Sequence, residues 1–181
     1  MRIIAGDWRG RPIAGPEGMA TRPTSDRARE GLFSMLASRV GSFEGLYVAD
    51  LFAGSGALGL EALSRGAAFC LFVDNERAAV EALSRNAERL GARDRIEIRT
   101  QSIQHAAPPP RPADLVFMDP PYGRGLAQLA LDRLCDPAWL APGAWLSLES
   151  EGEAIAIPRG LSKVTERRFG KAHITLLQKS A

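Results

Sequence analysis

The chain has 181 residues, of which 45% are hydrophobic and 24% are charged, a composition typical of one ordinary globular domain. No apolar run approaches the ~20 residues that a membrane span needs, and the start MRIIAGDWRGR lacks the apolar stretch of a signal peptide. Cys70 and Cys135 are the only cysteines, which excludes a disulfide framework or a zinc-spaced cluster, so we expect a cytoplasmic protein without a metal site.

The formal net charge of +2 is unevenly spread along the chain. Residues 1–40 hold 7 arginines against 4 acidic residues, and residues 158–181 hold 6 basic residues against one acidic residue. Residues 41–157 hold 10 basic and 16 acidic residues. An acidic centre between basic ends suits a cationic cofactor in the middle of the chain and a polyanion at its flanks. Solubilising surface charge would give the same distribution, so the charge alone leaves both interpretations open.

The N-terminal forty residues stand apart from the rest of the chain. The segment IIAGDWRGRPI predicts a short arginine-rich hairpin. The following TSDRAREGLFSML predicts a helix capped by Thr24 or Ser25, with Phe33 and Leu36 supplying apolar contacts. We interpret this part as an extension and not as an independent domain.

From residue 46 onward, strand patterns alternate with helical patterns. Parallel strands are expected at 46–52, 69–73, 96–99, 113–118 and 144–148, and helices at 59–66, 76–90 and 126–134. Two more strands are expected at 163–168 and 172–177, with a turn at 169–170. The alternation predicts an α/β fold with a doubly wound, mostly parallel sheet, helices on both faces and a final antiparallel hairpin at one edge.

A glycine motif follows the first of these strands. Gly54-Ser-Gly56-Ala-Leu-Gly59 matches the G-x-G-x-x-G pattern, in which backbone comes close to a ligand at a helix N-terminus. Asp74 ends the next strand, where a carboxylate reaches ribose hydroxyls. These features fit a nicotinamide dinucleotide and S-adenosylmethionine equally, because both carry an adenosine ribose. Tight glycines at a strand-to-helix turn would look the same without any ligand.

Two further features favour S-adenosylmethionine over a dinucleotide. Asp50, four residues before Gly54, places a carboxylate where it would repel a pyrophosphate and attract an ammonium or sulfonium group. The tetrapeptide DPPY, residues 119–122, ends the fourth strand. Ligands of open α/β sheets bind beyond the carboxyl ends of the strands, so residues 50–56, 74 and 119–122 should converge on one crevice. A dehydrogenase has no use for DPPY, although Asp-Pro-Pro is also ordinary turn chemistry.

The tetrapeptide suits methyl transfer to an exocyclic amine of a nucleobase, which is a poor nucleophile because its lone pair is delocalised into the ring. Asp119 and the carbonyl of Pro120 would accept hydrogen bonds from the amine, and Pro120 and Pro121 would stiffen the turn. Tyr122 would stack on the base, worth roughly 1–3 kcal/mol. Asp119 would also stabilise the positive charge that builds on nitrogen. These four residues are the expected catalytic group.

The glycine loop AGSGALGLEALSRGA (53–67), DPPY and the N-terminal segments RIIAGDWRGRPI and TRPTSDRAREGLFSML (21–36) together resemble one known family over essentially the whole chain. It is the bacterial 16S ribosomal RNA guanine-N2 methyltransferase family, the D-type enzyme of the small subunit. The resemblance implies a Rossmann-like class I methyltransferase fold, S-adenosylmethionine as methyl donor, and a guanine of 16S ribosomal RNA in the 30S subunit or an assembly intermediate as acceptor. We expect a monomer.

The resemblance also implies the domain organisation and the cofactor site. Residues 1–40 would cover RNA and cofactor, and residues 41–181 would form the S-adenosylmethionine-dependent methyltransferase domain. Ser102, after the third strand, would lie near the adenine, in place of the Asp or Asn of many relatives. The residues expected to bind the cofactor are Asp50, Gly54, Gly56, Asp74 and Ser102.

The basic N-terminal part is the expected RNA-binding surface. Arginines that close over the crevice would grip phosphates, with a threonine hydrogen-bonding nearby. The alternative is a helix start with solvated arginines. The expected RNA-contacting residues are Arg9, Arg11, Arg22, Thr24, Arg27 and Arg29.

Three other functions stay open beside guanine-N2 methylation. The same chemistry would serve an amino methyltransferase that acts on adenine or cytosine in DNA, or on a glutamine amide. A nicotinamide oxidoreductase is disfavoured by Asp50 and by DPPY. A non-catalytic RNA-binding protein would need neither of these features.

Overall fold

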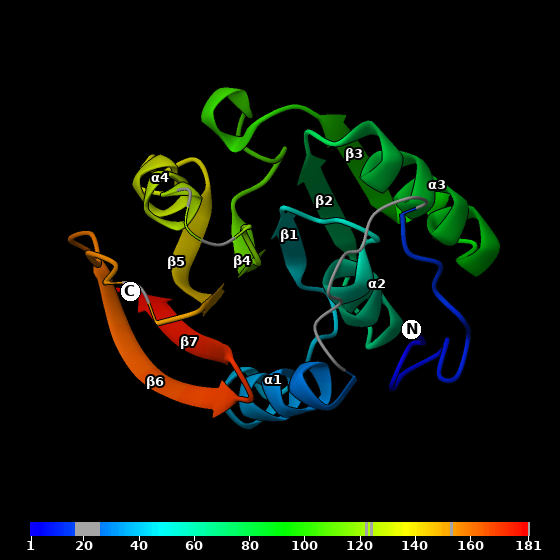
Figure 1. Ribbon diagram of the computed structural model, residues 1–181, viewed down its shortest axis with the longest axis horizontal. Coiled ribbons are helices and arrows are strands. Elements are labelled where there is room, and N and C mark those ends of the chain that lie inside the picture. The colour runs from blue at the N-terminus through cyan, green and yellow to red at the C-terminus, as the bar shows by residue number, and fades with distance from the viewer. Residues whose placement is uncertain (17–25, 122, 124, 153, 181) are drawn as a thin grey trace.

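The computed structural model describes residues 1–16, 26–121, 123, 125–152 and 154–180 of the chain. Its centre is a seven-stranded sheet with the order β3-β2-β1-β4-β5-β7-β6 (Figure 1). The strands are β1 (Tyr47–Leu51), β2 (Phe69–Asp74), β3 (Ile96–Thr100), β4 (Ala113–Met118), β5 (Leu140–Ser150), β6 (Leu161–Phe169) and β7 (Ala172–Lys179). The helices are α1 (Asp26–Val40), α2 (Ala57–Ser64), α3 (Arg77–Leu90) and α4 (Leu126–Arg133), with short 3-10 turns η1 (Arg93–Arg95) and η2 (Ile103–His105).

The pairing of the strands confirms the predicted topology. The first five strands run parallel to one another, whereas β7 runs antiparallel to both β5 and β6. The chain leaves β1 toward β2 and β3 on one side, and β4 lies on the other side of β1. A ligand crevice is expected where the strand order reverses in this way, at the carboxyl ends of β1 and β4.

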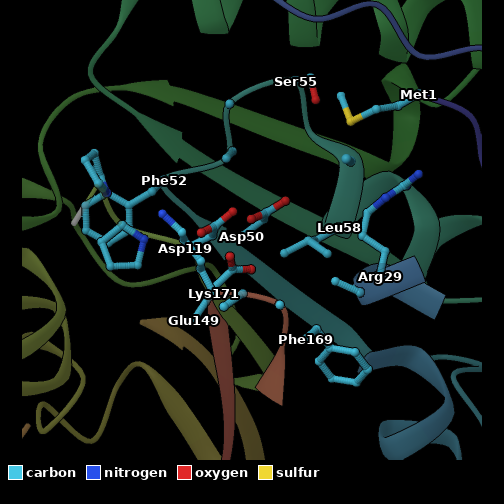
Figure 2. A pocket seen from close by; sticks show the side chains of 18 of the residues that line it. Met1, Arg29, Asp50, Phe52, Ser55, Leu58, Asp119, Glu149, Phe169 and Lys171 are labelled. Atoms are coloured by element: carbon cyan, nitrogen blue, oxygen red, sulfur yellow. The ribbon is translucent and has the colours of Figure 1, made fainter. Parts of the chain in front are cut away.

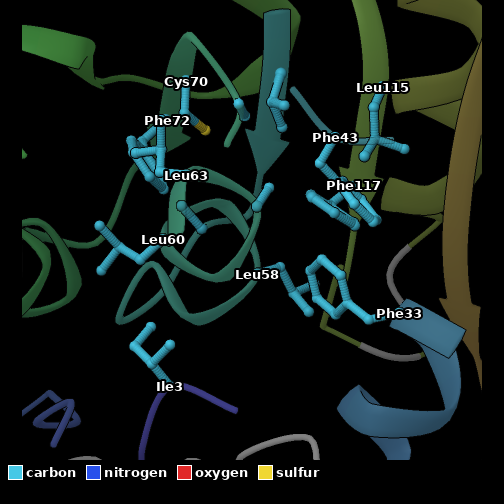
Figure 3. Packing of buried hydrophobic residues seen from close by; sticks show 14 of the residues in the cluster. Ile3, Phe33, Phe43, Leu58, Leu60, Leu63, Cys70, Phe72, Leu115 and Phe117 are labelled. Atoms are coloured by element: carbon cyan, nitrogen blue, oxygen red, sulfur yellow. The ribbon is translucent and has the colours of Figure 1, made fainter. Parts of the chain in front are cut away.

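Alternate residues of the parallel strands face two separate cores. On one face, Val48 and Phe117 belong to the core that packs against α1, α2 and α3. On the other face, Ala49 and Val116 belong to the core formed with α4, Ile103 and Trp139. Figure 3 shows the first core, in which the ring centroid of Phe33 on α1 lies 5.5 Å from that of Phe117. In the part of the chain that the structure describes, no helix is long and apolar enough to cross a membrane.

Gly59, the third glycine of the motif, brings α2 against β2. A Cβ atom at this position would lie 2.3 Å from Cε1 of Phe72 and 2.6 Å from Sγ of Cys70. Such distances are far inside van der Waals contact, so only glycine permits this approach of helix and sheet. The third glycine of the motif is therefore used for packing.

The N-terminal segment runs beside α2 and α3 (Figure 1). Buried polar side chains of these helices hold it there. The carboxylate of Glu61, which is 0% exposed, accepts hydrogen bonds from the backbone N–H groups of Ile4 (2.7 Å) and Ala5 (3.0 Å). Oγ of Ser64 accepts from the N–H of Trp8 at 3.0 Å. Asn86 on α3 accepts from the N–H of residue 14 and donates to the carbonyls of residues 14 and 55. These bonds tie the first sixteen residues to the glycine turn.

Candidate functional site

A cleft of about 980 Å³ opens at the carboxyl ends of β1 and β4 (Figure 2). Its walls come from the glycine turn, the segment after β4, the end of β5, the start of α1 and the turn between β6 and β7. The volume lies at the upper end of the roughly 300–1,000 Å³ of small-molecule sites. Of the predicted site residues, the cleft brings together Asp50, Gly54, Asp119, Pro120, Pro121, Arg27 and Arg29.

The glycine turn is fixed by Asp74. Gly54 and Gly56 adopt left-handed backbone conformations, with φ of 55° and 79°. Oδ2 of Asp74 accepts a hydrogen bond from the N–H of Gly54 at 2.7 Å, and Oδ1 accepts from the N–H of Glu76 at 2.8 Å. Gly56 precedes α2 without a side-chain cap. Asp74 therefore ends β2 beside the turn as predicted, but Asp74 and Gly56 are not among the residues that line the cleft.

Asp50 lies beneath the turn and is only 2% exposed. Its Oδ2 accepts a hydrogen bond from the N–H of Gly59 at 2.8 Å. Burial raises the pKa of Asp50 well above its ordinary value; the Gly59 bond opposes this shift, and the charges of Asp119 and Asp74 add to it. A cation placed in the cleft would relieve this electrostatic penalty.

Asp119, Pro120 and Pro121 line the cleft directly after β4, next to the turn. Asp119 is half-buried, Pro120 is buried and Pro121 is exposed. Tyr122, the last residue of the tetrapeptide, lies outside the described residues. The carboxylates of Asp50 and Asp119 therefore reach one cleft from neighbouring strands (Figure 2).

Ser102 lies farther away, after β3. Its Oγ caps η2 by accepting from the N–H of Gln104 at 3.4 Å, and its side chain is half-buried. It does not line the cleft. A role beside the adenine of a cofactor stays a prediction.

Three of the predicted RNA-contacting arginines lie on the surface. Arg9, Arg11 and Arg27 are exposed, and Arg27 also lines the cleft. Arg22 and Thr24 lie outside the described residues.

Arg29 differs from the expectation, because it is 0% exposed. Its Nη2 donates to Asp26 at 2.6 Å and to the carbonyl of Arg2 at 2.7 Å. Within the described residues, its Nε and Nη1 are buried without a hydrogen-bond partner. In this structure Arg29 joins the N-terminal segment to α1, and its contact with an RNA phosphate stays a prediction.

Several residues of the cleft were not predicted from the sequence, among them Glu149 and Lys171. Glu149, from β5, and Lys171, from the β6–β7 turn, approach Asp119 in Figure 2. Phe52 has a φ of 64°, the only left-handed non-glycine residue in the described part of the chain. Such strain is uncommon away from functional sites. No local pattern places Glu149 or Lys171 in the cleft, since they come from a strand and a turn far along the chain.

Comparisons with known proteins agree with this architecture. The model of the family described as Conserved hypothetical protein 95 matches residues 1–178. Ribosomal RNA small subunit methyltransferase D of Escherichia coli K12 is 39% identical over 183 residues, covering 100% of this chain and 91% of that protein. The protein of the same name in Haemophilus influenzae is 37% identical, covering 98% and 93%.

A solved structure gives the same result for the fold. The structure of yhhF from Escherichia coli, named as a methyltransferase, has a TM-score of 0.87 at 36% identity, covering 100% of this chain and 98% of that chain. The fold is therefore the class I methyltransferase fold, as the sequence predicted.

Proposed function

Since the chain belongs to the family described as Conserved hypothetical protein 95, and has ribosomal RNA small subunit methyltransferase D among its relatives, we propose that it methylates ribosomal RNA of the small subunit. The methyl donor is S-adenosylmethionine and the acceptor is the exocyclic N2 of one guanine in 16S ribosomal RNA. The enzyme acts as a monomer in the cytoplasm, on the 30S subunit or an assembly intermediate.

One observation carries the proposal. Asp119, which would hold the acceptor amine, and the glycine turn, which would hold the methyl donor, line the same cleft. Methyl transfer needs donor carbon and acceptor nitrogen in line and in contact, and binding both in one cleft supplies much of that positioning. An RNA-binding protein without catalytic function would not need this convergence.

The residues around the turn have the chemistry that S-adenosylmethionine requires. When bound, the cofactor supplies a methyl group on a positively charged sulfur, which keeps the electron pair of the carbon–sulfur bond. Asp50 would face the charged head of the cofactor, and the turn at Gly54 and Gly56 would let the backbone come close. Asp74 would take the ribose hydroxyls, and Ser102 would lie near the adenine. The raised pKa of Asp50 fits this role, because a buried carboxylate gains from an adjacent cation.

The residues after β4 would prepare the acceptor. Asp119 and the carbonyl of Pro120 would accept hydrogen bonds from the two N–H groups of the guanine amine. These bonds would direct the nitrogen lone pair at the methyl carbon. Nitrogen gains positive charge as the new carbon–nitrogen bond forms, and Asp119 stabilises that charge. The methylated amine is then strongly acidic and releases one proton to solvent without a dedicated base. Pro121 would stiffen the turn, and Tyr122 would stack on the base.

The RNA would be held by exposed arginines at the cleft and outside it. Arg9, Arg11 and Arg27 would bind phosphates through their guanidinium groups. Such contacts would hold an unpaired RNA segment in place while one base is splayed out. Arg22 and Thr24 belong to the same proposal. Arg29 stays in the proposal as a residue that would have to leave its buried position to reach a phosphate.

The test is methyl transfer from labelled S-adenosylmethionine to 30S particles, free 16S RNA and duplex DNA, with wild type and Asp119→Ala side by side. The particles come from a strain that lacks the enzyme, and nuclease digestion identifies the labelled base. We expect label in N2-methylguanine. We expect Asp119→Ala to lower the rate by about 10²–10³-fold, as loss of a charge-stabilising group does, while cofactor binding measured by calorimetry is retained.

Each alternative has its own outcome, in this experiment or in a binding measurement made beside it. Label in adenine or cytosine of duplex DNA would keep the fold and the donor but replace the acceptor. Tight NADH binding would favour an oxidoreductase. Wild-type protein that binds 30S particles without transferring label would indicate a binding protein.

A further inference from the structure

Glu149 occupies a special position beside the acceptor side of the cleft. It is the penultimate residue of β5, and the preceding Leu148 pairs with Met118 of β4. Because β4 and β5 are parallel, Glu149 continues the ladder beside Asp119. Figure 2 shows the side chains of Glu149, Asp119 and Asp50 directed into the same part of the cleft.

The burial of Glu149 makes this position informative. The residue is only 8% exposed, although glutamate is rarely buried. It also lines a cleft that already contains the carboxylates of Asp50 and Asp119, and the charge of Asp119 raises the pKa of Asp50. Carboxylates brought together in this way are typical of functional sites, where a bound ligand offsets the repulsion between them. A ligand surface with several hydrogen-bond donors would match these carboxylates, which share the cleft with the Lys171 ammonium.

The Watson–Crick edge of guanine has such a surface. Its exocyclic N2 carries two N–H groups, and the adjacent ring nitrogen N1 carries a third. In adenine and cytosine, the ring nitrogen next to the amine is an acceptor with a lone pair. A carboxylate that faces this ring nitrogen therefore distinguishes guanine from the other two amino bases.

We propose that Glu149 accepts a hydrogen bond from N1–H of the acceptor guanine while Asp119 holds its N2 amine. The inference rests on the proposed function and adds the residue that selects the base. Adenine or cytosine in the same position would direct a ring lone pair at the carboxylate, and this repulsion excludes them. A site built to pair a substrate N–H rejects an analogue that lacks it far more strongly than a hydrophobic pocket does.

The test compares two acceptors that differ at N1. Wild type first locates the methylated guanine in the particle. Small-subunit particles are then reconstituted with either guanine or 2-aminopurine at that nucleotide. Both bases carry an amine at C2, but N1 of 2-aminopurine is an acceptor. We compare kcat/KM on the two particles for wild type, Glu149→Gln and Glu151→Gln. Glu151, an exposed carboxylate two residues farther along, also lines the cleft, so its substitution is the matched control for the loss of one carboxylate charge there.

Wild type is expected to favour guanine. In Glu149→Gln the side-chain amide can donate to N1 of 2-aminopurine, so the guanine to 2-aminopurine ratio should fall by about 10- to 100-fold, the loss typical of one charged hydrogen bond. Glu151→Gln should keep the wild-type ratio. The ratio does not depend on the fraction of active enzyme, so partial misfolding of a variant would leave it unchanged.

An unchanged ratio in Glu149→Gln would overturn the inference and leave the proposed function intact. Wild type that produces no N2-methylguanine on guanine particles would contradict the proposed function itself, and this inference with it. The two failures are therefore distinguishable within one set of reactions.

Discussion

At the scale of single residues, Asp50 shows how the site and the stability of the protein are linked. Burial is the main reason that its pKa is raised, and Asp119 and Asp74 add to the shift against the opposing bond from Gly59. The folded chain therefore holds the Asp50 proton more tightly than the unfolded chain does. Ionisation of this residue opposes folding, so its contribution to stability declines as pH rises from the ordinary aspartate range through the raised pKa.

The substitution Asp50→Asn is expected to remove this loss of stability with rising pH. Asparagine cannot ionise, and its side-chain oxygen can still accept from Gly59. In urea denaturation, the variant should match wild type at low pH. It should become the more stable of the two as pH rises from the ordinary aspartate range through the raised pKa of Asp50. Its affinity for S-adenosylmethionine in calorimetry should fall by about 10-fold or more, because a charged contact typically contributes about 1.5–3 kcal/mol. A variant that is less stable at every pH, or that binds the cofactor normally, would refute this account of Asp50.

At the scale of elements, the contact between α2 and β2 positions the glycine turn. Replacing Gly59 by alanine would have two effects of opposite sign on the free energy of unfolding. Alanine is the better helix former by about 1 kcal/mol, but its Cβ would collide with Phe72 and Cys70 in the core. Overpacking of a tight core costs about 1–3 kcal/mol, so the collision should outweigh the helix propensity.

Gly59→Ala is therefore expected to lower the free energy of unfolding, as measured by urea denaturation. Pairing it with Phe72→Leu, which vacates part of the space, should recover some of the loss. The double-mutant cycle should show favourable coupling between the two changes. A gain in stability for Gly59→Ala alone would show that the helix can shift away from the sheet at little cost.

The elements were predicted more completely than the site, for a physical reason. Hydrophobic periodicity is a local property, and it predicted the five parallel strands and the final hairpin. β5 departs from the predicted strand because it begins already at Leu140. Its pairing with β4 has a register irregularity between Ala113 and Leu115, which accommodates Pro142 and Gly143 within the strand. The burial of Arg29 depends on the distant carbonyl of Arg2, and Glu149 reaches the cleft only through sheet pairing. Local patterns do not contain such contacts.

At the scale of the whole molecule, the distribution of charge separates the tasks of the chain. The acidic middle contains the cleft residues Asp50, Asp119 and Glu149, which suit a cationic donor and an amine. The basic N-terminal part presents Arg9 and Arg11 on the surface, where they suit an RNA backbone. RNA binding through phosphates releases counterions, so the affinity should depend on salt.

Replacing Arg9, Arg11 and Arg27 by glutamine should flatten that dependence. For single-stranded segments, each lost phosphate contact lowers the slope of log affinity against log salt concentration by about 0.7. The triple variant should therefore lose about 2 from this slope between about 50 and 200 mM salt. Filter binding to 16S RNA gives the slope. The control variant changes Arg77 and Arg93, exposed arginines paired with Glu81 and Glu88. Equal slopes for the triple variant and wild type would remove these arginines from the RNA interface.

The most direct measurement of the central claim is the nucleoside composition of 16S ribosomal RNA in a bacterium without its own copy of the enzyme. The RNA is digested and analysed by mass spectrometry after complementation with wild type or with Asp119→Ala. The account predicts that wild type restores one N2-methylguanosine per 16S molecule and that Asp119→Ala, expressed at the same level, does not. Unchanged N2-methylguanosine with wild type, or restoration by both proteins, would contradict methyl transfer at this cleft.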